Sequence, residues 1–583
     1  MSGRLRQRLP GGGGGAGLAA AVAGLAHAAA LAWPLPWALG ARLQPGEPVP
    51  WLHGLSLMAL VALLARAASW RAAAWRTGVY ASAWLAGTFW WLFISMHVYG
   101  GLWAPLAAVA VLALAAFLAL DYVLLAVLWW RWRGHGLAAA ASFAAAWTLA
   151  ELARGLLWTG FPWGAGGYAQ IDALGWAAPW VGVYGLGALA AALAAAAVLT
   201  RGLGRAVALG LGGVLWAVPG SGAWLAQHLP DFTAPAGALP VRLLQGAIAQ
   251  DRKFDADDGI PLALRWYGAR VVEAAADPAL AGGLVVAPET AIPLLPQDLP
   301  ADYWYGLAAA VRQGQVALLM GVPLGDFARG YTNSVAGWRP GQAPLPTGQA
   351  AASRDSAAAP AARPSDGADS APVAAANASN TTPTPLGLAD YRYDKHHLVP
   401  FGEFIPPGFR WFVDLMHMPL GDFQRGALPQ PPLHWAGQRI APHVCYEDLF
   451  GEELAAAFRD PAQAPTVLVN VSNIAWFGDT VAIDQHRQIA RLRALELGRP
   501  MLRATNTGAT AVIDHRGRVL AQWPYGARGV LDTVVEGRSG VTPYAAWVAR
   551  WGLWPLALAC LLLWGAAAWR GCGGASRRIG GLC

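Results

Sequence analysis

The feature that most constrains this chain is a series of apolar runs, each long enough to cross a lipid bilayer. A hydrocarbon core of roughly 30 Å needs about 20 helical residues. We predict eight membrane-spanning helices, over residues 16–38, 51–69, 77–99, 102–130, 136–157, 178–200, 206–226 and 547–569. Of the 583 residues, 56% are hydrophobic and only 13% are charged, which excludes a soluble protein of ordinary composition. The first run is followed by further spans and lacks a small-residue cleavage site, so we expect it to remain as an anchor.

Arginine is distributed unevenly between the segments that join these runs. One set of short loops, together with both ends of the chain, carries thirteen arginines, and the alternate short loops carry only Arg42. The thirteen are Arg4, Arg6, Arg8, Arg66, Arg71, Arg76, Arg131, Arg133, Arg201, Arg205, Arg570, Arg577 and Arg578. Because short cytoplasmic loops hold the positive charge of membrane proteins, both termini are predicted to be cytoplasmic. The long segment before the last span is then outside, in the periplasm of a two-membrane bacterium. The net charge of +7 follows from this asymmetry and predicts no nucleic-acid partner.

Ionisable side chains also occur within the predicted spans, where they are costly unless they are paired. Glu151 and Arg154 lie three residues apart, on one face of the same predicted helix. We interpret them as a structural ion pair.

The long extramembrane segment follows a different pattern. Short β-branched or aliphatic runs predict buried strands over residues 241–244, 283–286, 316–320, 466–469 and 510–513. Helical patterns over 260–276 and 486–497 lie between some of these strands. Strands that alternate with helices indicate a layered α/β domain.

The chain therefore divides into three parts. We predict a membrane domain of about seven helices over 1–226, an α/β domain over 227–543, and a membrane helix with a cytoplasmic tail over 544–583. Within the α/β domain, residues 341–386 are Ala, Ser, Pro, Thr and Gly with almost no large apolar side chain. Such a composition cannot bury a core, so we predict a disordered insertion.

Two scarce residue types mark candidates for chemistry. Of the four cysteines, only Cys445 lies outside apolar or tail sequence, and without a local disulfide partner it is predicted to be a free thiol. The alternative for a lone Cys is a small buried hydrophobe. Of 41 Lys plus Arg, only Lys253 and Lys395 are lysine. In a chain so rich in Arg, Lys395 indicates a position where a compact ammonium is needed.

A carboxylate completes a possible constellation. Glu289 directly follows a predicted apolar strand. A thiol becomes a useful nucleophile when a base takes its proton or a cation favours the thiolate. A desolvated carboxylate can act as that base, and an ammonium can stabilise the oxyanion that forms. Glu289, Lys395 and Cys445 would together make an acyl-transfer site, and the alternative is three unrelated solvated strand ends.

Three segments carry a resemblance to a known superfamily. Residues 288–291 (PETA), Lys395 with 399–404 (VPFGEF), and 443–447 (HVCYE) resemble the signature segments of the nitrilase superfamily. With membrane spans on either side, the chain resembles the membrane-integrated branch, the apolipoprotein N-acyltransferases. Supporting matches lie at 159–163, 244–246, 475–479 and 493–500. The resemblance implies a multi-span α-helical membrane domain joined to a periplasmic nitrilase-like domain, an α-β-β-α sandwich.

The resemblance also implies the roles of particular residues. Cys445 would be the nucleophile, Glu289 the general base, and Lys395 the cation beside the tetrahedral intermediate. Four further residues would support the site or bind substrate, namely Glu403, Tyr446, Glu447 and Trp476. One departure from the expected pattern is Ile474, where we expect an acidic residue.

The implied reaction has two steps. A membrane phospholipid, such as phosphatidylethanolamine, gives a fatty acyl chain to Cys445 as a thioester. The α-amino group of an apolipoprotein's N-terminal diacylglyceryl-cysteine then takes the chain as an amide. No metal or other cofactor is implied, because His396 and His397 have no companion ligands at metal spacing. We expect a monomer in the bacterial inner membrane.

Two alternative functions remain open at this point. A membrane-tethered nitrilase-type amidase would use the same three residues to hydrolyse a small amide, although a tether needs one span rather than seven. A transporter or lipid scaffold with a degenerate domain would have lost at least one of the three residue types, yet all are present. The apolar segment 409–423 is predicted to be either a mobile arm at the outer membrane interface or a core helix.

Overall fold

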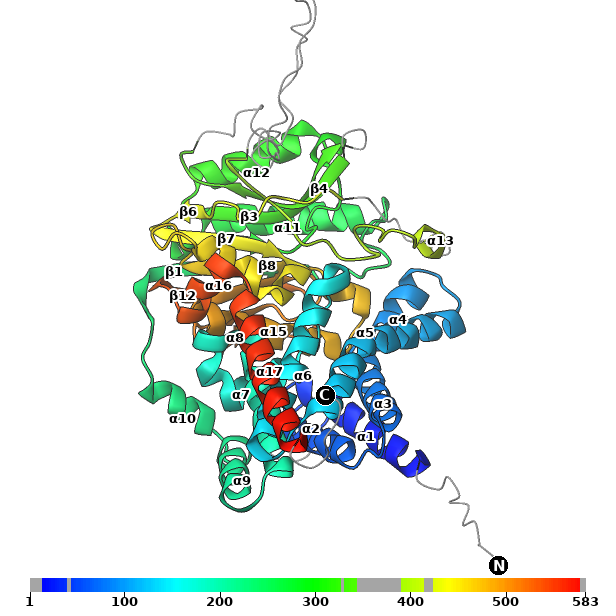
Figure 1. The fold of residues 1–583 in the computed structure, drawn as a ribbon. Helices are drawn as coiled ribbons and strands as arrows, with labels where there is room; N and C mark the ends of the chain where they lie inside the picture. Colours follow the sequence, from blue (N-terminus) through cyan, green and yellow to red (C-terminus); the bar gives the residue numbers. More distant parts are fainter. Residues whose placement is uncertain (1–12, 39–42, 327–329, 343–388, 414–422, 577–583) are drawn as a thin grey trace, which may run out of the picture.

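The computed structural model describes residues 13–38, 43–326, 330–342, 389–413 and 423–576. A bundle of helices and an α/β domain stack on each other, and both the first and the last described helices belong to the bundle (Figure 1). Nearly all of the predicted insertion over 341–386 lies outside the described residues, as do residues 414–422 of the apolar segment.

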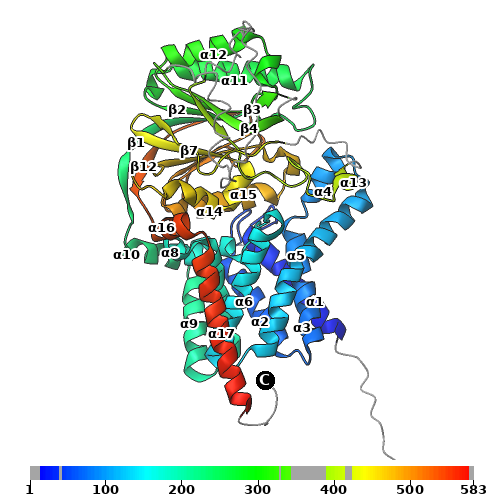
Figure 2. The ribbon, with the colours of Figure 1, turned by 45° about the horizontal axis from the view of Figure 1, so that its top comes forward.

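Each of the eight predicted membrane runs overlaps a helix, although the bounds differ by several residues. These helices are α1 (Gly13–Leu31), α2 (Pro50–Ala65), α3 (Trp70–Thr88), α5 (Ala104–Trp132), α6 (Gly136–Leu156), α8 (Ala178–Leu199), α9 (Gly202–Ala217) and α17 (Trp554–Ser576). Among the residues that the structure describes, four helical segments are long and apolar enough to cross a membrane, or seven if each bent pair counts as one span. Although α17 follows the α/β domain in the sequence, it packs beside α6 (Figure 2). The last helix thus completes the bundle formed by the first part of the chain.

Three predicted spans are not single helices. Each is bent at a short break between two helical segments. The bend is 63° between α3 and the segment formed by α4 (Leu92–Ile94) and the π-helix η1 (Ser95–Tyr99). It is 97° between α9 and α10 (Ser221–His228), and 92° between α16 (Pro543–Trp551) and α17. At two of the breaks a glycine has a left-handed backbone, Gly220 with φ 78° and Gly552 with φ 57°. Glycine adopts this conformation without a steric penalty, so the chain turns sharply there despite its apolar composition.

The predicted ion pair between Glu151 and Arg154 is wrong. Oε1 of Glu151 accepts a hydrogen bond from the backbone N–H of Gly166 at 2.8 Å. Nη1 of Arg154 donates to the carbonyl oxygens of Phe161 and Trp163 at 2.5 and 2.8 Å. The irregular chain after α6 has backbone groups that an apolar surrounding would leave unsatisfied, and the two buried charges satisfy some of them. They therefore fix the loop that leads toward the α/β domain.

The described part of the α/β domain contains two six-stranded sheets. The first has the order β12-β1-β2-β3-β4-β5, and the second has the order β11-β10-β9-β8-β7-β6. The first comprises β1 (Thr233–Gln245), β2 (Leu284–Ala287), β3 (Ala317–Asp326), β4 (Gly330–Trp338), β5 (Tyr391–Asp394) and β12 (Gly529–Gly540). The second comprises β6 (Leu433–Trp435), β7 (Gln438–Val444), β8 (Val467–Ser472), β9 (Met501–Thr505), β10 (Ala511–Ile513) and β11 (Val519–Gln522). The predicted run 241–244 falls within β1, the other four predicted runs each begin one residue before the observed strand, and both predicted helices are present.

The sheets pack face to face, with helices on both outer sides. Side chains of β2, β7 and β8, such as Val286, Val444 and Val469, meet in a core between the sheets. Helices α11 (Gly259–Ala276) and α12 (Ala301–Gln313) cover the first sheet, and α15 (Val481–Leu497) lies on the side of the second sheet (Figure 1). The predicted fold class, a helical membrane domain joined to an α-β-β-α sandwich, is confirmed.

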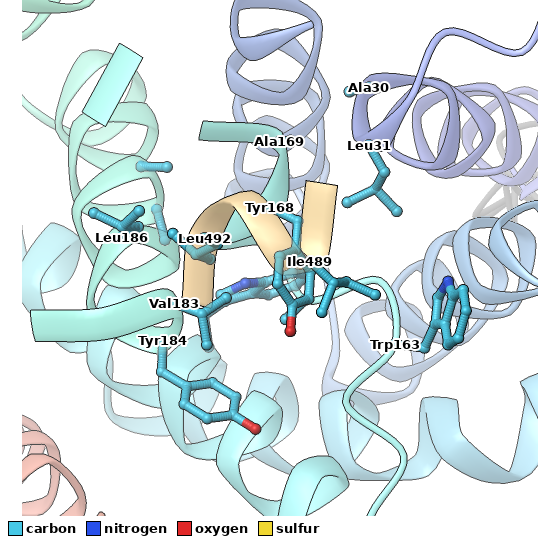
Figure 3. Close-up of a cluster of buried hydrophobic side chains, with 14 of the residues drawn as sticks. Ala30, Leu31, Trp163, Tyr168, Ala169, Val183, Tyr184, Leu186, Ile489 and Leu492 are labelled. Carbon is cyan, nitrogen blue, oxygen red and sulfur yellow. The ribbon is translucent and has the colours of Figure 1, made fainter. Parts of the chain in front are cut away.

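Helix α15 also joins the two domains. Its side chains Ile489 and Leu492 pack in one buried cluster with Leu31, Tyr168 and Val183 of the helical bundle (Figure 3). Because this core is continuous across the boundary, the sandwich is seated on the bundle through apolar contacts as well as polar ones.

Candidate functional site

The three residues predicted to carry chemistry come together where strands of both sheets end. Glu289 follows β2, Lys395 directly follows β5, and Cys445 directly follows β7. Nζ of Lys395 lies 3.7 Å from Oε1 of Glu289. The thiol of Cys445 is close enough to both for their charges to act on its pKa. Three residues that are far apart in the sequence therefore share one site.

The backbone at Cys445 forms a tight turn. Its φ of 52° lies in the left-handed region, which costs a non-glycine residue of order 1–3 kcal/mol. The carbonyl oxygen of Cys445 accepts hydrogen bonds from Nδ2 of Asn470 at 3.1 Å and from Nε2 of His486 at 3.3 Å. The thiol sulfur accepts one from Oγ of Ser472 at 3.2 Å. The surrounding side chains thus hold the strained turn that presents the sulfur.

The carboxylate of Glu289 has a fixed orientation. Oε1 accepts a hydrogen bond from Nδ2 of Asn333 at 2.7 Å, and Oε2 accepts one from the backbone N–H of Asn473 at 2.7 Å. With one donor on each oxygen, the carboxylate is held in a single plane.

The ammonium of Lys395 is buried and bound to a second carboxylate. Only 1% of Lys395 is exposed, and Nζ donates to Oε1 of Glu403 at 2.9 Å. Nδ2 of Asn333 donates to that same oxygen at 2.7 Å. Burial alone would lower the pKa of Lys395, but the charges of Glu403 and Glu289 outweigh it and hold that pKa above its ordinary value. The lysine is therefore a permanent cation at the site.

Whereas Lys395 stays charged, the surroundings of Cys445 favour its neutral form. Burial, together with the charge of Glu289, raises the pKa of its thiol to about 12, although the charge of Lys395 opposes both. The sulfur is thus a neutral thiol near pH 7 and needs a base to become a nucleophile. The site therefore does not hold a preformed thiolate near pH 7.

Glu447 connects the ends of two strands. Its Oε1 accepts a hydrogen bond from the backbone N–H of His396 at 2.7 Å, and its Oε2 accepts one from the backbone N–H of Val444 at 2.6 Å. These residues adjoin Lys395 and Cys445, so Glu447 fixes the spacing between them. Burial raises the pKa of Glu447.

Tyr446 connects the site to the helical bundle. Its hydroxyl donates to the carbonyl oxygen of Gly160 at 3.0 Å, and its ring lies against Phe450. Gly160 follows the left-handed residues Trp158 and Thr159, in the turn after α6. The residue that follows Cys445 is therefore bound to a loop of the membrane domain.

Trp476 lies at the boundary between the domains. It belongs to the short helix Ile474–Phe477, and its ring meets that of Tyr99 edge to face at 5.8 Å. Ile474, which stands where we expected an acidic residue, is buried. The neighbouring Asn473 still provides the backbone donor to Glu289.

A buried network of charged side chains binds the backbone of Cys445 through His486. His443 donates to Oδ1 of Asp448, and Nη1 of Arg503 donates to Oδ2 of Asp448 at 2.6 Å. Nη2 of Arg503 donates to Nδ1 of His486, 3.0 Å away, and the other nitrogen of that ring binds Cys445. Burial would raise the pKa of Asp448, but His443 and Arg503 outweigh it and lower that pKa to about 2.

The apolar segment after Lys395 reaches the helical bundle. Within the short helix α13 (Arg410–Val413), Val413 packs against Leu102, just before α5, and against Ala107 in its first turn. Trp411 is 63% exposed, which disagrees with the core-helix alternative. Helix α13 lies beside α4 at the edge of the molecule (Figure 2).

Several residues of the site were not predicted from the sequence. Asn333 and Ser472 gave no local signal, because polar residues on a strand are usually solvated. Lys253 did give one, as the only other lysine. It is 2% exposed, and its Nζ donates to the backbone carbonyl oxygen of Glu289 at 3.2 Å. In the described part of the chain, no group of three or more His, Cys, Asp and Glu is placed to hold a metal ion.

Comparison with known proteins identifies relatives of the whole chain. A family model for the apolipoprotein N-acyltransferase N-terminal domain matches residues 38–196, and a carbon-nitrogen hydrolase model matches residues 379–542. The chain is 51% identical over 563 residues to an apolipoprotein N-acyltransferase of Verminephrobacter eiseniae, covering 92% of each protein. It is 45% identical over 500 residues to one of Ralstonia nicotianae, covering 85% of each.

Solved structures share similarity with part of the chain. A carbon-nitrogen hydrolase from Helicobacter pylori is 14% identical, with a TM-score of 0.33, and the match covers 55% of this chain and 94% of that one. An amidase from Nesterenkonia sp. is 16% identical, with a TM-score of 0.33 and coverage of 54% and 94%.

Proposed function

The chain belongs to the apolipoprotein N-acyltransferase family, and we propose that it transfers a fatty acyl chain from a membrane phospholipid to the α-amino group of an apolipoprotein's N-terminal diacylglyceryl-cysteine, through a thioester on Cys445. The observation that carries this proposal is a partly buried thiol that shares its site with a carboxylate and a permanent ammonium, and whose neighbour Tyr446 binds a loop of the membrane domain.

In the first step, Glu289 removes the proton from the thiol of Cys445. Such a base is required because burial keeps the thiol neutral near pH 7. The sulfur then attacks the ester carbonyl of the phospholipid, and the carbonyl oxygen becomes an oxyanion beside the ammonium of Lys395. When the C–O bond breaks, the proton held by Glu289 passes to the departing lyso-lipid oxygen. The enzyme retains the acyl chain as a thioester.

In the second step, the free amine of the acceptor attacks the thioester carbonyl. Glu289 takes a proton from the amine, and Lys395 again lies beside the oxyanion. The C–S bond breaks, the proton returns to the sulfur, and the product leaves as an amide. Donor and acceptor therefore use the same three residues in turn, which makes the reaction ping-pong.

Glu403 prepares the cation for both steps. Its Oε1 lies 2.9 Å from Nζ of Lys395, whereas Oε1 of Glu289 lies 3.7 Å from it. Because Glu403 is the closer partner of the ammonium, Glu289 is left to accept protons. Tyr446, Glu447 and Trp476 would support the site, through the contacts that they make with the membrane-domain loop, the strand ends and Tyr99.

Both proposed substrates carry acyl chains that reside in a bilayer. The contact between Tyr446 and Gly160 supports a route from the membrane, because it joins the turn after Cys445 to the membrane domain. The arginine distribution supports a bacterial inner-membrane protein with a periplasmic catalytic domain and both termini in the cytoplasm. One chain supplies all three proposed catalytic residues, so we propose a monomer.

Family membership favours transfer over the amidase alternative, in which water would take the acyl group. The scaffold alternative predicted a degenerate site, but Glu289, Lys395 and Cys445 are all present and close together.

Mass spectrometry of the purified protein incubated with phospholipid tests the proposal. We expect a fatty-acyl adduct on Cys445 and none on Cys560, Cys572 or Cys583, and the adduct should disappear when diacylglyceryl peptide is added. Cys445→Ser should form no thioester, since an alkoxide is far harder to generate than a thiolate. Cys560→Ser, which changes the buried cysteine of α17, is the matched control. An undiminished acyl-enzyme yield in Cys445→Ser would reject Cys445 as the nucleophile.

A further inference from the structure

The two lysines of this chain act on the same residue. Lys395 lies beside the carboxylate of Glu289, and Lys253 donates to the backbone carbonyl oxygen of Glu289 at 3.2 Å. Lys253 belongs to the loop between β1 and α11, far in the sequence from Lys395. Long-range folding has thus brought both scarce ammonium groups to the residue that we propose as the base.

The two ammonium groups differ in their surroundings. Lys395 has a bound carboxylate from Glu403, whereas no carboxylate among the described residues forms an ion pair with Lys253. Burial lowers the pKa of Lys253 to about 8, although the charges of Glu289 and Cys445 oppose that shift. A buried cation without a bound counterion is costly for stability, so its presence here indicates a role in function.

The carbonyl that Lys253 holds belongs to a strained peptide. The next residue, Thr290, has a φ of 49°, in the left-handed region that β-branched residues avoid. On the other side, Gly321 of β3 approaches the same chain so closely that a Cβ there would lie 2.6 Å from Cα of Glu289. The backbone that carries the carboxylate is therefore confined between β3 and an ammonium.

We propose that Lys253 is a positioning residue for the base, because its ammonium holds the Glu289–Thr290 peptide in the strained turn that aims the carboxylate. A charged donor binds a carbonyl more strongly than a neutral amine does. The positioning is therefore lost when Lys253 loses its proton. This inference rests on the proposed role of Glu289 and adds a second lysine to the site.

The experiment compares wild-type protein with Lys253→Met, which keeps the length of the side chain and removes the donor. The rate of thioester formation on Cys445 is measured from pH 6 to pH 10, together with the melting temperature in detergent. At pH 7 we expect Lys253→Met to be about tenfold slower or more, since small misplacement of a reacting group has effects of this size. The rate of thioester formation by the wild-type protein should decrease above about pH 8, because Lys253 loses its proton there. The rate of the variant should show no such decrease.

The melting temperature separates positioning from support of the fold. Replacing a buried cation by an apolar side chain leaves stability unchanged or higher, so the variant should be slow and at least as stable. The neighbouring exposed Arg252→Met is the control and should change neither rate nor stability. Three results would each overturn the inference: an equal rate at pH 7, the same fall above pH 8 in the variant, or a loss of stability that accounts for the loss of rate.

A second measurement keeps this inference separate from the proposed function. Alkylation of Cys445 by iodoacetamide needs no lipid but still requires removal of the thiol proton. If wild-type protein formed no thioester with phospholipid, the proposed function would fail, and the alkylation rates of wild type and Lys253→Met would still decide the role of Lys253. An identical pH dependence of alkylation in both proteins would exclude that role.

Discussion

The ammonium of Lys395 is bound to Glu403 rather than to Glu289: Nζ lies 2.9 Å from Oε1 of Glu403 and 3.7 Å from Oε1 of Glu289. Asn333 donates to both carboxylates at 2.7 Å and so fixes their separation. Glu403 is thus the nearer partner of the ammonium, and the carboxylate of Glu289 is left to act as the proposed base.

Glu289→Gln keeps the size of the side chain but cannot accept a proton. We expect acyl-enzyme formation to fall by about 10²–10⁴, which is typical of the loss of a general base. Quantitative mass spectrometry of the Cys445 adduct over time measures this rate. Glu273→Gln, on the exposed side of α11, is the control and should retain the wild-type rate. A Glu289→Gln protein with at least a tenth of the wild-type rate would show that another group takes the proton.

Lys395→Arg keeps the charge but changes its shape. The side chain is 1% exposed, so the larger planar guanidinium cannot take the place of an ammonium beside a small oxyanion. We expect acyl-enzyme formation to fall by about a hundredfold or more, which is typical of the loss of an oxyanion donor. The exposed substitution Arg252→Lys is the converse control. Full activity of Lys395→Arg would mean that charge alone suffices and that the compact ammonium is not required.

Asp448→Asn should lower stability in a pH-dependent way. Despite burial, His443 and Arg503 lower the pKa of Asp448 from the ordinary value of 3.8 to about 2 in the folded protein. The ionised carboxylate therefore contributes about 2 to 3 kcal/mol to the free energy of unfolding at pH 7. Because the folded pKa is depressed, this contribution is fully present above about pH 4 and is lost as the pH falls through about 2. Thermal unfolding in detergent should therefore show a lower melting temperature for Asp448→Asn at pH 7, and a smaller difference at pH 3.

The exposed Asp302→Asn controls for loss of charge and should unfold like wild type at both pH values. A difference between Asp448→Asn and wild type that stays constant from pH 7 to pH 3 would show that the carboxylate charge does not stabilise the fold.

Trp411→Ser tests whether the segment after Lys395 is an arm at the membrane interface. Trp411 is 63% exposed, so its loss should leave the melting temperature unchanged, and phospholipid turnover should fall if the indole enters the bilayer interface. Val413→Ser is the paired variant, because Val413 is buried against Leu102 and Ala107 and its replacement should lower the melting temperature. A large fall in melting temperature for Trp411→Ser, with normal specific activity of the folded protein, would reject the arm.

The sequence by itself determined the elements of the fold and the residue types of the proposed site. Apolar length marked the membrane helices, and short aliphatic runs marked strands such as 241–244, because both patterns are local. Glu289 was recognisable because a carboxylate directly follows a predicted apolar strand, and Cys445 because it is the one cysteine outside apolar or tail sequence. Lys395 was recognisable because lysine is scarce in this chain.

Tertiary structure alone decided which groups meet. Glu151 and Arg154 are well spaced for an ion pair, yet each binds the backbone of a loop that the sequence could not place beside them. Asn333 bridges two carboxylates, and Lys253 reaches the Glu289 carbonyl, because separate strands and loops end at the same place. Periodicity reports only on near neighbours along the chain, whereas these contacts depend on how two sheets pack against each other and on the membrane helices.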